Sequence, residues 1–186
     1  AGSCRACSTS DLTIVDNLVR NVVGALGITT TDNAATNPTD SVTRRITVAR
    51  LLTEDSVALA PYSTAAQIRM LTLLGPIHDI DILDSRFVDF GANPAQALLF
   101  GTAPVTRLTV RNIAVKRGQY GISASGATEG LAAWTLRAPN GVWSNNAVLG
   151  ANVVIYPPGT LSTASATHGL DRALLHAKLV GVVVPR

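Results

Sequence analysis

The chain contains 186 residues, of which 47% are apolar, 15% charged and 4% aromatic, and its formal net charge is +3. This composition excludes a disordered chain and predicts one domain with a core built mainly from Val, Ile, Leu and Ala. The basic residues form no run, so we expect no nucleic-acid partner. No stretch approaches the roughly 20 apolar residues that span a bilayer, so we also expect no membrane span.

Residues 1–10 are predicted to be a lead-in or the edge of the first repeat. The sequence begins AGSCRACSTSD, without Met and without a basic-then-apolar signal region, which is typical of a processed mature protein or of a piece of a longer one. Cys4 and Cys7 form a single C-x-x-C. Zinc needs two more ligands at matching spacing and a thioredoxin-type site needs a βαβ context, and the sequence offers neither. A local disulfide in a secreted protein and no role beyond the N-terminus both stay open.

Residues 11–160 contain a repeated pattern. Four segments align without gaps: DLTIVDNLVRNV from Asp11, RITVARLLTEDS from Arg45, DIDILDSRFVDF from Asp79 and RLTVRNIAVKRG from Arg107. A fifth, GVWSNNAVLGA from Gly141, aligns more loosely. The second apolar residue of each segment recurs at spacings of about 34, 34, 28 and 33 residues. These positions are Ile14, Val48, Ile82, Val110 and Trp143.

The apolar–polar alternation in each repeat predicts a strand with one buried face. Two further apolar runs follow before a loop with Gly or Pro, as in IRMLTLLGP. Three short strands per repeat without helical periodicity are typical of one coil of a parallel β-helix. Leucine-rich repeats would need a shorter period and a steady L-x-x-L-x-L, which is missing. We therefore predict an all-β fold, a right-handed parallel β-helix (solenoid) of about five coils over residues 11–160, with a non-repeating C-terminal cap or tail over residues 161–186.

Four stretches carry a resemblance to a known family: LTIVDNLVRNV (12–22), RRITVARLL (44–52), LTVRNIAV (108–115) and WSNNAVLGANVVIYPPG (143–159). They resemble the bacterial right-handed parallel β-helix proteins of the pectate-lyase-like superfamily, above all secreted or surface proteins whose coils read φ-T-φ-x-x-N. The resemblance implies this fold and a secreted or cell-surface location. It implies little about activity, because the superfamily contains lyases, hydrolases, epimerases and adhesins.

One position departs from the pattern of that family. The Asn of the turn between the first two strands is kept only at Asn17 and Asn146, with Leu51, Ser85 and Ile113 elsewhere. We therefore expect no unbroken ladder of Asn side chains. Other contacts must stabilise these turns.

Stacking of the repeats would align the residues that precede each first strand. These residues are Asp11, Arg45, Asp79, Arg107 and Asn140. The charges alternate in sign, and opposite charges on neighbouring strands stabilise a sheet by roughly 0.2–1 kcal/mol. Asp79 is therefore better explained as part of the stacked scaffold than as a catalyst.

Asp79, Asp81 and His78 are nevertheless the candidate catalytic residues, because paired carboxylates can divide acid and base roles. By the resemblance, metal-dependent polysaccharide lyases of this fold bind calcium through carboxylates on the same face. The aligned neighbours of Asp81 are Thr47 and Thr109, whereas a metal site needs further acids. We therefore predict no metal and no cofactor, with Ca²⁺ expected only if the protein is an enzyme.

Candidate ligand-binding residues are Arg45, Arg107 and Trp134. The two arginines could hold the carboxylate of a uronic acid. Trp134 lies in EGLAAWTLRAPNG, which we expect to be a loop, and could stack on a sugar ring. Trp143, at an inward repeat position, is predicted to belong to the core.

Two functions remain open from the sequence. The first is an extracellular structural or interaction module without catalysis, which associates with itself, with further coils of a longer parent chain, or with polysaccharide. It is favoured by an outer face rich in Thr and Arg and by an uncapped first repeat, whose strand edges invite pairing. The second is a lyase, hydrolase or epimerase that acts on an acidic polysaccharide.

Overall fold

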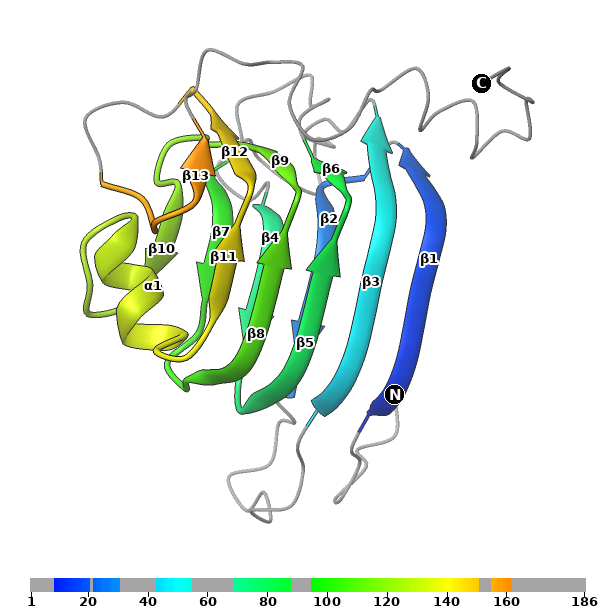
Figure 1. The fold of residues 1–186 in the computed structure, drawn as a ribbon, viewed down its shortest axis with the longest axis horizontal. Coiled ribbons are helices and arrows are strands. Elements are labelled where there is room, and N and C mark those ends of the chain that lie inside the picture. The colour runs from blue at the N-terminus through cyan, green and yellow to red at the C-terminus, as the bar shows by residue number, and fades with distance from the viewer. Residues whose placement is uncertain are drawn as a thin grey trace.

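The computed structural model describes residues 9–20, 22–30, 43–54, 69–87, 95–150 and 155–161. This part of the chain forms strands and one helix, shown in Figure 1. The strands are β1 Ser10–Arg20, β2 Gly24–Thr29, β3 Thr43–Glu54, β4 Arg69–Leu74, β5 Ile77–Leu83, β6 Arg86–Phe87, β7 Gln96–Phe100, β8 Val105–Arg111, β9 Ala114–Lys116, β10 Ile122–Ala124, β11 Val142–Ser144, β12 Asn146–Leu149 and β13 Thr160–Leu161. The helix is α1, Leu131–Arg137. The predictions for Cys4, Cys7 and the tail after residue 161 lie outside the described residues.

The strands form two parallel sheets, and the chain alternates between them. The larger sheet has nine strands in the order β11-β8-β5-β3-β6-β9-β12-β13, with β1 paired to β3, and the smaller has four in the order β10-β7-β4-β2. Figure 1 shows β1, β3, β5 and β8 side by side in the larger sheet. We call the strands that one repeat contributes a layer, so β1 and β2 form layer 1, β3 and β4 layer 2, and β11 and β12 layer 5.

The alignment of the repeats predicted from the sequence is confirmed by the pairing of the larger sheet. Ile14 lies opposite Val48, Val48 opposite Ile82, and Ile82 opposite Val110. Val110 in turn lies opposite Trp143, so the looser fifth segment is in the same register. A shift by one residue would turn the apolar side chains outward, and the repeated alternation therefore fixes this register.

The strands of the larger sheet bend at polar residues in the left-handed conformation. Asp16 in β1 has a φ of 58° and Arg50 in β3 a φ of 53°, and the ladder between the two strands continues on both sides of them. The other non-glycine residues with positive φ are Asp11, Arg45, Asp79, Asp84, Arg107, Asn112 and Asn145. Such a residue turns the strand at a cost of roughly 1–2 kcal/mol, which Asp and Asn bear best. The bends recur at the same two positions of the first four repeats and at the second of these positions, Asn145, in the fifth.

The predicted fold class, an all-β right-handed parallel β-helix of about five coils, is wrong. The mostly parallel strands form a nearly closed, barrel-like arrangement together with the helix α1, which is closer to an α/β barrel. We expected separate short strands within each repeat, but β3 runs from Thr43 to Glu54 and pairs with β5 in its first half and with β6 near its end. Asp16 and Arg50 bend the long strands β1 and β3 without ending them, whereas β5, β8 and β11 end just before the left-handed residues of the later repeats. The long strands join these shorter ones into one curved sheet.

The core lies between the two sheets and is aliphatic, as the composition predicted. Its largest fully buried side chains are Phe87, Phe100, Leu52, Met70, Leu71, Leu73, Ile77, Ile80, Ile82, Leu98 and Leu108. At the layer 5 end, Trp134 of α1 packs against Phe100 and Trp143 with ring centroids 6.0 and 5.1 Å away. Edge-to-face contacts of this kind stabilise beyond the area they bury. The helix thus covers the core at this end.

Within the described part of the chain, no helix is long and apolar enough to cross a membrane.

Candidate interaction surface

The charges that alternate near the start of β1, β3, β5 and β8 form ion pairs, as the sequence predicted. The guanidinium group of Arg45 donates to both carboxylate oxygens of Asp11, at 2.5 and 2.7 Å. Arg107 likewise donates to both carboxylate oxygens of Asp79. These hydrogen bonds lower the pKa of both carboxyl groups below the usual range. Such exposed pairs contribute little stability each, but they favour one order of layers.

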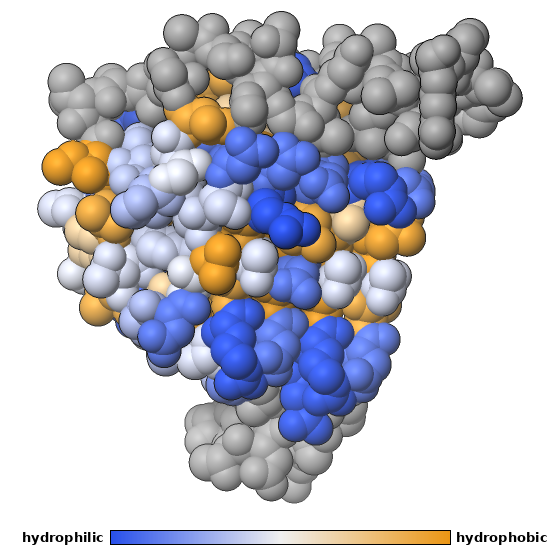
Figure 2. All heavy atoms as spheres, viewed as in Figure 1, coloured by the Kyte–Doolittle hydropathy of each residue, from blue (hydrophilic) through white to orange (hydrophobic). Residues whose placement is uncertain are grey.

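A second polar column lies at the bend of the strands, two residues after the second apolar residue of each repeat. Arg50 donates to both oxygens of Asp16, at 2.5 and 2.7 Å. In the later layers Asn112 donates to Asp84 at 2.8 Å and Asn145 donates to Asn112 at 3.1 Å. Figure 2 shows two hydrophilic bands that cross the strands of the larger sheet, with a paler band between them. In the sequence, this column is indicated by a polar residue at the same distance from the second apolar residue in every repeat.

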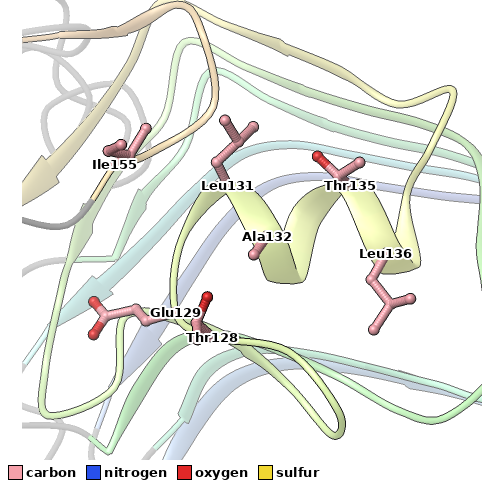
Figure 3. A pocket seen from close by; sticks show the side chains of 7 residues that line it. All are labelled: Thr128, Glu129, Leu131, Ala132, Thr135, Leu136 and Ile155. Carbon is pink, nitrogen blue, oxygen red and sulfur yellow. The ribbon is translucent and has the colours of Figure 1, made fainter.

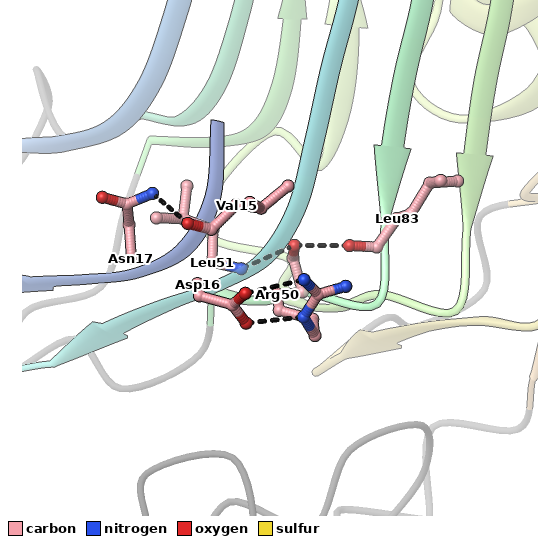
Figure 4. Close-up of polar contacts among 7 residues, drawn as sticks. Val15, Asp16, Asn17, Arg50, Leu51 and Leu83 are labelled. Atoms are coloured by element: carbon pink, nitrogen blue, oxygen red, sulfur yellow. Dashed lines mark hydrogen bonds and ion pairs between the residues drawn. The ribbon is translucent and has the colours of Figure 1, made fainter. Parts of the chain in front are cut away.

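Buried polar side chains stabilise the turns that lack a continuous Asn ladder. The N–H of Leu51 donates to Ser85 Oγ at 3.0 Å, and Ser85 donates to the carbonyl of Leu83 at 2.7 Å (Figure 4). In the next pair of layers, the N–H of Ile113 donates to Asn146 Oδ1 at 3.0 Å. Apolar and polar residues therefore alternate at this position. Ser85 and Asn146 bind the backbone of the layer before them, whereas Asn17 donates to the carbonyl of Val15 in its own layer at 2.8 Å. The prediction that other contacts stabilise these turns is confirmed.

The three candidate catalytic residues lie close together on β5, but each has a different environment. Asp79 is held by Arg107, and His78 Nδ1 contacts Thr106 Oγ1. Asp81 lies between Thr47 and Thr109, as the alignment predicted. Among the described residues, no group of three or more His, Cys, Asp or Glu side chains could hold a metal ion. The catalytic role of the three residues stays an untested prediction.

The candidate ligand-binding residues differ from expectation in their surroundings. Arg45 and Arg107 each donate two hydrogen bonds to a carboxylate of the chain itself. In this arrangement they already bind a carboxylate, so they do not offer the same two donors to a uronic acid. Trp134 is 5% exposed and belongs to α1, not to a loop. The expected loop is therefore wrong, and the ligand-binding role of Trp134, Arg45 and Arg107 stays an untested prediction. The apolar spacing of LAAWTLR was the overlooked helical signal. Trp143 is in the core as predicted, at 7% exposed.

Layer 1 exposes an apolar side chain, Leu12, at a position that is buried in layers 2 to 4. Leu12 is 41% exposed, whereas its register partners along the column, Ile46, Ile80 and Leu108, are 3%, 0% and 0% exposed. Val15 is also exposed, at 37%. Among the described residues, β1 pairs only with β3 and β2 only with β4, so both sheets end at layer 1. The open face of layer 1 is the candidate interaction surface.

A second apolar surface lies beside α1. Its groove has a volume of about 880 Å³ and is lined by Thr128, Glu129, Leu131, Ala132, Thr135, Leu136 and Ile155 (Figure 3). The carboxylate of Glu129 accepts hydrogen bonds from Arg117 at 2.8 and 2.5 Å and from the hydroxyl of Tyr156 at 2.6 Å. Burial raises the pKa of Tyr156, and the bond to Glu129 acts in the same direction. This cluster joins the ends of three loops, and its charges are already paired.

No protein-family model, no curated protein and no solved structure matches this chain. The resemblance to the pectate-lyase-like superfamily therefore stays a prediction.

Proposed function

We propose that the protein is a structural interaction module that binds a further β-strand at the open face of layer 1. The observation that carries this proposal is Leu12, which is 41% exposed at a position where three following layers bury an apolar residue almost completely. Each of those layers is covered by the layer before it in the chain. A strand laid against β1 would cover Leu12 in the same way.

The physical driving force is the same as inside the sheet. An edge strand offers backbone N–H and C=O groups for pairing, and strand addition at such an edge is a recurring way to bind a polypeptide. The burial of apolar side chains adds roughly 25 cal/mol per Å². With β1 at 11 residues, the edge is long enough for a register to be defined by alternating side chains.

The opposite end supports a one-sided module. There α1 lies over the core, and Trp143 Nε1 donates to Thr160 Oγ1 at 2.8 Å, which ties β13 to β11. Among the described strands, β11 and β10 also pair on one side only, but α1 packs over the core beside them. A second copy would meet this helix, so indefinite head-to-tail growth is disfavoured. The strand expected at layer 1 therefore comes from a partner polypeptide, not from the helix-covered end of a second copy.

A peptide of residues 43–54, the sequence of β3, is a suitable probe because it already pairs with β1 in the folded protein. We expect its addition to the full chain to slow hydrogen exchange of the β1 amides. The variant Leu12→Asp should lose this protection, because a carboxylate would replace the apolar contact. Leu136→Asp is the matched control, since Leu136 is 44% exposed on α1 at the other end. Unchanged exchange in β1 at saturating peptide, or equal loss in both variants, would contradict the proposal.

A further inference from the structure

The charged column of the larger sheet has a regular order that stops at the open face. Asp79 lies between two arginines, because Arg107 donates to it and Arg45 attracts it from the other side. Arg45 lies between two carboxylates, since it donates to Asp11 and is attracted by Asp79. Arg45 and Asp79 therefore each have a residue of opposite charge on both neighbouring strands.

Asp11 is the first described member of this column. Its carboxylate is held by Arg45 on the layer 2 side, and its side chain is still 62% exposed. A strand that covers Leu12 would bring its own residue at this position next to Asp11, because paired strands lie about 4.8 Å apart. A carboxylate there would face the carboxylate of Asp11, and like charges on neighbouring strands destabilise a sheet.

We infer that the strand bound at layer 1 runs parallel to β1 and carries a cationic residue, arginine or lysine, beside Asp11. This inference rests on the proposed function and names the chemistry of its partner. The apolar residues that follow the cation would cover Leu12 and Ile14, as Ile46 and Val48 follow Arg45 in β3. The partner is thus a segment with a basic residue followed by two alternating apolar residues.

The direction of the strand follows from the pairing already present. Every pair among the described strands is parallel, and the bends at positive φ occur at the same two positions of layers 1 to 4. A parallel strand can follow these bends in register. An antiparallel strand would place its own bends opposite unbent parts of β1. The residue that it brings beside Asp11 would then lie near the C-terminal end of the bound strand.

The experiment compares two labelled peptides on the full chain. One has the sequence of residues 43–54, and the other has the same sequence with R45E. We expect the first to bind about five-fold more tightly at low salt, measured by fluorescence anisotropy, and we expect the ratio to fall as salt screens the exposed charges. Hydrogen exchange of β1 confirms that each peptide binds at this edge.

Two protein variants assign the preference to Asp11. Asp11→Asn keeps a residue that tolerates a φ of 59° and should bind both peptides equally. Asp79→Asn removes the equivalent charge two layers away and should keep the preference. Urea unfolding of both variants checks that they are folded.

The outcomes separate the inference from the function on which it rests. Binding of both peptides to the wild type with equal affinity would leave strand addition intact and overturn the cationic preference. A preference that survives Asp11→Asn would also overturn it. Failure of both peptides to slow exchange in β1 would contradict strand addition itself.

Discussion

Asn146 provides the most direct test of the contacts between layers. Its side chain accepts a hydrogen bond from the N–H of Ile113 at 3.0 Å and donates one to the carbonyl of Val110 at 2.8 Å. The residue has no exposed surface. The variant Asn146→Ala removes both partners and leaves a backbone donor and a backbone acceptor buried between layers 4 and 5.

The expected loss follows from these two groups. A buried polar group left without its partner costs about 1–3 kcal/mol, so two such groups cost about 2–6 kcal/mol. The space left by the amide adds to this cost. We therefore expect Asn146→Ala to lower the free energy of unfolding by about 2–6 kcal/mol, a large part of the stability of an ordinary domain.

Urea unfolding followed by circular dichroism measures this loss, with an unchanged m-value as the sign that the native structure is retained. Asn145→Gly is the matched control. Asn145 is an exposed neighbour whose amide donates to Asn112 at 3.1 Å, and Gly accepts its positive φ of 55°. We expect this variant to lose less than about 1 kcal/mol. Equal losses in the two variants would refute the role of the buried amide.

Three further predictions concern the ion pairs and the covered end. Arg50→Asn should leave the urea midpoint nearly unchanged, because Asn suits the left-handed conformation. Arg50→Val should lower the free energy of unfolding by about 1–3 kcal/mol, because a β-branched residue does not. Equal effects of the two variants would show that the bend carries no strain. The hydrogen bond from Arg107 lowers the pKa of Asp79 in the folded state, so this pair stabilises the fold above the unfolded pKa of about 3.9 and loses its contribution as the pH falls through the folded value. As the pH falls below the unfolded pKa of about 3.9, stability should fall less steeply in Asp79→Asn than in the wild type, and identical slopes would contradict the pairing. Trp134→Ala should cost about 3–5 kcal/mol in thermal or urea unfolding, whereas a cost below about 1 kcal/mol would show that α1 does not seal the core.

The repeat alone determined which residues lie opposite one another. Alternating apolar residues at a fixed spacing admit only one register with a buried face, so the pairing of Ile14, Val48, Ile82 and Val110 follows directly from the sequence. The alternating charges predicted the pairs of Arg45 with Asp11 and Arg107 with Asp79 for the same reason. The aliphatic composition predicted the character of the core.

Only the tertiary structure decided how the strands join and what lies at the two ends. A bend that needs a positive φ is not visible at Arg50 in the sequence, because arginine seldom adopts it, and the long strand β3 and the curved sheet depend on that bend. Trp134 was assigned to a loop because seven residues are a weak helical signal by themselves, and it is the packing on Phe100 and Trp143 that buries it. The exposure of Leu12 also lies beyond the sequence, since it has the same pattern as its buried counterparts and differs only in having no described strand on its outer side.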